Sequence, residues 1–208
     1  IIDVLDTAEY VEITGKGENQ TNMQVQLAAI SNPEKQTKFE NCVADVNIPL
    51  GEVFTSPKLA GTNGILNVGT VYIGDIQYRN LRMEFKDGRV VSAVCDNFVE
   101  NGVIDQEAGH RLIVQGIMNG HETLPLGEFA IGTNTTAYAM AEKFGILDRL
   151  PILIVEKMGP HFAVGDTCYS WSEDSPMYNP DGKEMIARDN EVSILRKEDV
   201  SKAYFGVH

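Results

Sequence analysis

The order of apolar and polar residues predicts several short strands. Between residues 23 and 29, apolar positions alternate with polar ones, as in a strand that buries one face. The segment 65–73 is predominantly apolar and predicts a second strand. Residues 81–85 and 90–94 flank an Asp87-Gly88 pair, which is typical of a tight β-hairpin turn. We therefore expect a protein rich in antiparallel strands.

Two other segments predict amphipathic helices. Over 105–118, apolar residues recur on one helical face, and Gly120 follows as a stop signal. A second helix is expected over 136–147, with Thr135 or Thr136 as its N-cap. The apolar face predicted for this second helix consists of Met140, Phe144 and Leu147.

A continuous apolar run follows the second helix. The run Pro151-Ile152-Leu153-Ile154-Val155 predicts a buried strand that ends at Glu156. Together, these segments predict the α+β fold class. We expect a strongly curved or barrel-like, mostly antiparallel sheet, flanked by helices near 105–118 and 136–147.

Composition narrows the class of protein. The chain has 208 residues, of which 43% are hydrophobic and 23% charged, as in an ordinary globular domain. Its formal net charge of −13 argues against binding to nucleic acid and to anionic membranes. No segment approaches the roughly 20 apolar residues that a membrane helix needs.

The N-terminal segment and the cysteines indicate the compartment. The first ten residues contain three acidic residues and no basic one, so no signal peptide is expected. The cysteines (Cys42, Cys95 and Cys168) are odd in number and form no CxxC pair, which favours reduced thiols in a cytoplasmic protein. The chain begins without methionine, so we expect an excerpt of a longer protein.

Three glutamates and a histidine at the edges of apolar segments are candidates for chemistry. These residues are Glu52, Glu128, Glu156 and His161. Carboxylate oxygen and imidazole nitrogen are the usual ligands of catalytic zinc or cobalt. Taken singly, each glutamate also fits a solvated turn, and the histidine fits a structural role. The zincin motif HExxH is absent, because His121-Glu122 is followed by Thr-Leu-Pro.

Three sequence blocks resemble the signature of one family. The blocks are GEVFTSP at 51–57, LGEFA at 126–130, and residues 156–165, where four residues separate Glu156 from His161. They are similar to those of the thermophilic metalloprotease family of metallo-aminopeptidases, of the aminopeptidase T, aminopeptidase S and PepS type. The resemblance implies a cytoplasmic homodimer of two-domain subunits. Residues 1–208 would then be a single catalytic domain, truncated at both ends relative to the parent protein.

The resemblance also implies a set of metal ligands. Glu52, Glu156 and His161 would bind metal, and Glu128 would bridge two ions and take part in catalysis. The family adds a His-x-Asp pair, which is missing between His161 and the end of the sequence, so His208 is the expected first half of that pair. The family's catalytic tyrosine position falls on Cys168, which makes the neighbouring Tyr169 the candidate.

The implied activity is hydrolysis of a peptide at its free N-terminus, using two divalent ions, zinc or cobalt. The tyrosine would stabilise the developing oxyanion. An alternative is a non-catalytic binding or dimerisation domain that keeps the family fold with an incomplete metal site. In a third interpretation the blocks are fortuitous and the chain is a β-rich scaffold.

Overall fold

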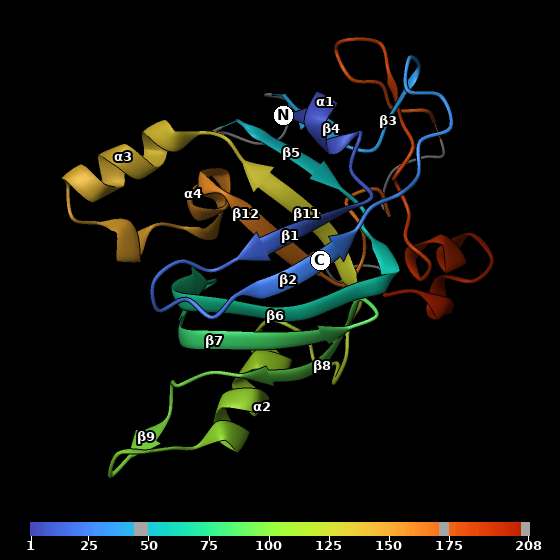
Figure 1. The fold of residues 1–208 in the computed structure, drawn as a ribbon. Coiled ribbons are helices and arrows are strands. Elements are labelled where there is room, and N and C mark those ends of the chain that lie inside the picture. Colours follow the sequence, from blue (N-terminus) through green and yellow to red (C-terminus); the bar gives the residue numbers. More distant parts are fainter. Residues whose placement is uncertain (44–49, 171–174, 205–208) are drawn as a thin grey trace.

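Most of the chain is built from antiparallel strands, as the computed structural model of residues 1–43, 50–170 and 175–204 shows (Figure 1). The largest sheet has the order β1-β2-β6-β7-β8. Its strands are β1 (Tyr10–Thr14), β2 (Asn22–Gln26), β6 (Lys58–Ile73), β7 (Ile76–Lys86) and β8 (Arg89–Val94). All of its strand pairs are antiparallel.

A second, four-stranded antiparallel sheet has the order β12-β11-β5-β4. Its strands are β4 (Glu40–Cys42), β5 (Glu52–Thr55), β11 (Leu126–Gly132) and β12 (Pro160–Val164). Two small pairs complete the sheets: β9 (Val99–Glu100) with β10 (Val103–Ile104), and β3 (Gln36–Thr37) parallel to β13 (Glu184–Met185). The predicted α+β class with mostly antiparallel sheet is confirmed, but the described strands form separate sheets and no closed barrel.

The helices are short and lie around these sheets. The α-helices are α1 (Ile2–Leu5), α2 (Gln106–Gly116), α3 (Thr135–Lys143) and α4 (Ile152–Val155). The 3₁₀ helices are η1 (Leu147–Arg149), η2 (Glu156–Met158), η3 (Ser193–Lys197) and η4 (Val200–Lys202). In Figure 1, α2 lies beside β8, whereas α3 extends away from the sheets.

Three local predictions are confirmed. The alternating residues of β2 are buried, namely Met23, Val25 and Leu27 just beyond its end. The hairpin β7–β8 turns at Asp87 and Gly88, which both have positive φ, as a two-residue turn of this kind requires. In α2, the Asp105 side chain caps the helix by accepting a hydrogen bond from the Ala108 N–H, and Gly120 follows with a φ of 84°.

The second predicted helix differs from expectation at both ends and on its face. The N-cap of α3 is Asn134, not a threonine, and the helix ends at Lys143. Met140 and Phe144 are exposed, Phe144 by 63%, and Ala141 is the buried residue. The predicted buried face was wrong. The spacing of apolar residues shows that a helix has an apolar face, but it does not show whether another element packs against that face.

The predicted strand at 151–155 is also wrong. Residues Ile152–Val155 form the single turn α4, and Leu153 is 55% exposed. A short apolar run fits a strand and a helical turn equally well, so periodicity could not separate them. Glu156 therefore does not end a strand but begins the 3₁₀ helix η2, directly after α4.

The main core fills the space between the two large sheets. Phe85 of β7 and Met23 of β2 belong to the same buried cluster as Phe129 of β11. In β11 the residues on either side of Phe129 point the other way, because successive side chains of a strand alternate between faces. One face of the four-stranded sheet therefore packs against the main core. The residues next to Phe129 lie on its other face and point away from that core.

A close backbone approach at Gly132 places η2 on the end of β11. A Cβ at Gly132 would lie 2.2 Å from the carbonyl oxygen of Glu156 and 2.2 Å from the carbonyl carbon of Lys157. The Gly132 N–H donates to the carbonyl of Gly159 at 2.8 Å, which holds the two segments together. Only glycine leaves room for this contact.

We expect Gly132→Ala to lower the free energy of unfolding by about 1–3 kcal/mol, because the added methyl forces η2 away from β11. Gly69→Ala in β6 is the matched control, since a Cβ there meets nothing within 4 Å. Urea denaturation of both variants measures the difference. Equal losses in the two variants would contradict the close contact.

Candidate metal centre

The strand register brings three of the predicted site residues to one face of the four-stranded sheet. Glu52 pairs with Gly132, and His161 pairs with Ala130. Directly paired residues of antiparallel strands point to the same face, and so do residues two apart on one strand. Glu52, Glu128 and His161 therefore share the face opposite the main core.

The three side chains converge in a buried space. The imidazole Nε2 of His161 lies 3.3 Å from Oε2 of Glu52 and 3.6 Å from Oε1 of Glu128. Glu52 is only 5% exposed and Glu128 only 7%. The His161 Nδ1 donates to the Gly159 carbonyl at 3.2 Å, so the ring turns Nε2 toward the carboxylates. Carboxylate and imidazole are side-chain types that zinc accepts as ligands.

Lys157 is a member of the cluster that the sequence did not indicate. Its ammonium nitrogen Nζ lies 2.5 Å from Oε2 of Glu52 and 3.0 Å from Oε1 of Glu156. The side chain is 1% exposed, which is rare for a lysine. The only signal in the sequence was its position directly after Glu156, and lysines are exposed by default.

Glu156 joins the cluster through Lys157. Its carboxylate binds the ammonium and is less buried than Glu52. In the part of the chain that the structure describes, no group of three or more His, Cys, Asp or Glu side chains is placed so that it could hold a metal ion as the side chains stand. His208 lies outside the described residues.

The electrostatics of the cluster favour its charged forms. Burial acts to raise the pKa of Glu52, but hydrogen bonds from His161 and Lys157 outweigh it and lower that pKa to about 2. Burial acts to lower the pKa of both Lys157 and His161. The neighbouring carboxylates outweigh burial in each case, so both of these pKa values are raised.

Cys168 and Tyr169 lie at different carboxylates. The Cys168 thiol donates to Oε2 of Glu128, whereas the Tyr169 hydroxyl donates to Glu40. The ring of Tyr169 stacks on Phe54 with 5.8 Å between centroids. Burial first, and nearby carboxylate charge second, raise the pKa of the thiol and of the phenol. The residue facing Glu128 is therefore the cysteine.

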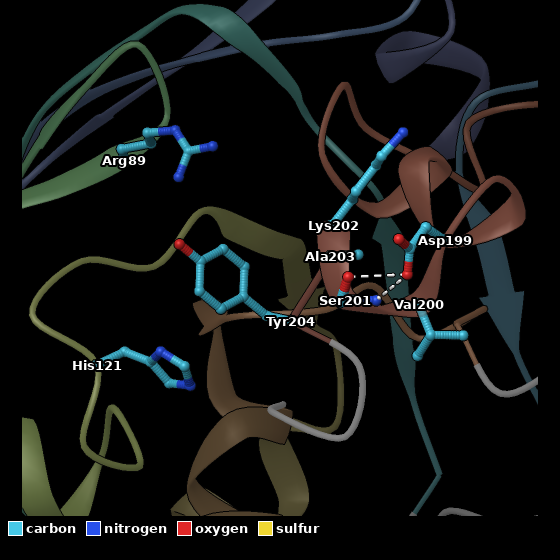
Figure 2. A pocket seen from close by; sticks show the side chains of 8 residues that line it. All are labelled: Arg89, His121, Asp199, Val200, Ser201, Lys202, Ala203 and Tyr204. Atoms are coloured by element: carbon cyan, nitrogen blue, oxygen red, sulfur yellow. Dashed lines mark hydrogen bonds between the residues drawn. The ribbon is translucent and has the colours of Figure 1, made fainter.

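A pocket of about 760 Å³ lies elsewhere and shares no residue with the cluster. Figure 2 shows Tyr204 near Arg89 and His121, with the 199–203 segment on the other side. His121 and Tyr204 meet edge to face, with 5.0 Å between centroids. None of the predicted ligands within the described residues lines this pocket.

Comparison with known proteins identifies the family. A buried cluster of carboxylates and an imidazole on one sheet face is typical of a metal-dependent hydrolase. Residues 1–177 match the family described as thermophilic metalloprotease (M29), and the chain belongs to that family. Its members are peptidases that use metal, as the family description states. A search of curated proteins found no match.

The fold is similar to a solved structure, wild-type AmpT from Thermus thermophilus, with a TM-score of 0.51 and 19% sequence identity. The similarity covers 80% of this chain and 38% of that chain, so this chain spans well under half of the AmpT structure. None of the helices within residues 1–43, 50–170 and 175–204 is long and apolar enough to cross a bilayer.

We expect the metal-free protein to lose stability as the pH falls from about 4.5 to about 2. Ionised Glu52 stabilises the folded state, because its pKa of about 2 lies below the value of 4.5 for a free side chain. This contribution is fully present above pH 4.5 and is lost as Glu52 takes up a proton. Thermal melts in chelator across this range measure the loss.

Glu52→Gln should be less stable than wild type at neutral pH and should lose less on acidification, because the amide does not titrate. Glu18→Gln, at an exposed position, is the control and should follow wild type. If wild type and Glu52→Gln lost the same amount of thermal stability on acidification, this role of Glu52 would be refuted.

Proposed function

We propose that the chain is the metal-binding part of an aminopeptidase, which removes N-terminal residues from peptides. The observation that carries the proposal is the position of His161 Nε2 between the carboxylates of Glu52 and Glu128. Without metal, the His161 ring donates from Nδ1 to the Gly159 carbonyl and from Nε2 to Glu52. Loss of the Nε2 proton would leave a lone pair facing two buried carboxylates. A cation among these three groups would stabilise all of them at once.

The residues present fit a divalent ion. Glu52, Glu128 and His161 would hold it, with the Gly159 carbonyl fixing the ring of His161. A bound zinc or cobalt ion supplies a Lewis acid and lowers the pKa of a water molecule. The resemblance implies that Glu128 would bridge metal ions and take part in catalysis. The catalytic role of Tyr169 stays a prediction, since its hydroxyl binds Glu40 and Cys168 is the residue beside Glu128.

Several finer expectations remain part of this proposal. A positively charged peptide N-terminus suits a centre rich in carboxylates. A second metal ion is an expectation from the resemblance, and so are Glu156 and His208 as metal ligands, the homodimer and the cytoplasmic location. The metal identity, zinc or cobalt, belongs here too.

The alternative is a non-catalytic domain that keeps the family fold. The specific observation in its favour is Cys168 at the position of the family tyrosine, in contact with Glu128. The two functions differ in turnover and not in fold.

Hydrolysis of an aminoacyl-anilide separates them. The purified protein with added zinc or cobalt should release the anilide, whereas the N-acetylated substrate should stay intact because it lacks the free amine. Removal of metal by a chelator should abolish turnover, and added metal should restore it. A folded, metal-loaded protein that shows no turnover would support the non-catalytic alternative.

We expect Glu128→Gln to weaken zinc binding by more than about 100-fold, because an amide lacks the charge and the second anionic oxygen of a ligand carboxylate. Calorimetric titration with zinc measures the change. Glu12→Gln, at an exposed position in β1, is the matched control and should bind as wild type does. Unchanged zinc affinity in Glu128→Gln would show that Glu128 is not a ligand.

A further inference from the structure

The ammonium of Lys157 lies inside the carboxylate cluster, in contact with Glu52 and Glu156. We propose that this ammonium takes the place of a second metal ion. The centre then binds one divalent ion through Glu52, Glu128 and His161, and Glu156 is the partner of Lys157 and not a metal ligand. This inference rests on the proposed function and alters the number of ions expected in it.

The backbone of Lys157 is held firmly in this position. Its carbonyl accepts a hydrogen bond from the Asn134 N–H at 2.9 Å, and the carbonyl of Gly159 accepts from the Gly132 N–H at 2.8 Å. These two hydrogen bonds connect η2 and the following Gly159 to the end of β11 and to Asn134, the N-cap of α3. With the side chain 1% exposed, the ammonium cannot turn to solvent without moving this segment.

The position of Nζ excludes a second ion at the same carboxylates. The Lys157 Nζ donates hydrogen bonds to Oε2 of Glu52 at 2.5 Å and to Oε1 of Glu156 at 3.0 Å. A divalent ion bound by both of these oxygens would need the space between them, and the ammonium fills that space.

The charges of the described residues accommodate one ion. Within the described part of the chain, the three carboxylates Glu52, Glu128 and Glu156 and the Lys157 ammonium leave two negative charges at the cluster. One divalent ion would neutralise these two charges.

The test counts zinc ions bound to the purified protein by native mass spectrometry after equilibration with zinc. Wild type should bind one ion. Lys157→Ala should bind two, because the shorter side chain opens the space between the Glu52 and Glu156 carboxylates that the ammonium fills in wild type. Lys38→Ala is the matched control and should bind one: Lys38 is similarly buried, at 3% exposure, but donates to the Ala8 carbonyl.

Glu156→Gln provides a second variant that does not depend on the folding of Lys157→Ala. It should still bind one ion, since Glu156 is not a ligand in this assignment. Two ions in wild type, or a single ion in folded Lys157→Ala, would overturn the inference and leave the proposed function standing. No zinc on wild type would overturn the proposed function as well.

Discussion

The candidate site depends on the buried ion pair between the Lys157 ammonium and the Glu52 carboxylate. A buried charge is tolerated only with a partner, and removing one member of such a pair leaves the other uncompensated. The pair also joins two parts of the chain that are 105 residues apart. It thereby fixes how η2 lies on the four-stranded sheet, and the same sheet face carries Glu128 and His161.

Gly127 and Gly132 let neighbouring segments pack closely against both ends of β11, the strand that carries Glu128. A Cβ at Gly127 would lie 1.9 Å from the carbonyl oxygen of Asp166, and one at Gly132 would meet the backbone of η2. The loop that follows Asp166 carries Cys168 to Glu128, and η2 carries Lys157 to Glu52. Small residues in LGEFAIG therefore serve the site, because they let two segments bring side chains against one strand.

Local patterns predicted local structure well, and distant contacts poorly. The Asp87-Gly88 hairpin and the capped helix α2 depend on residues that are close in sequence, and both were predictable. The exposed face of α3 and the turn α4 were not, because their environment is set by tertiary packing. The convergence of Glu52, Glu128 and His161 depends on strand register. Resemblance to a family indicated these residues, but composition and spacing did not. Lys157 was missed because a lysine beside a candidate glutamate looks like an ordinary surface residue in a sequence.

The most direct test of this account is a crystal structure of the zinc-loaded protein with anomalous diffraction recorded at the zinc edge. The account predicts one anomalous peak among Glu52 and Glu128 carboxylate oxygens and His161 Nε2, with the Lys157 ammonium still in contact with Glu52. A second peak between Glu52 and Glu156, with the lysine displaced, would contradict the central role given to the ion pair. A peak remote from Glu128 and His161 would contradict the metal centre itself.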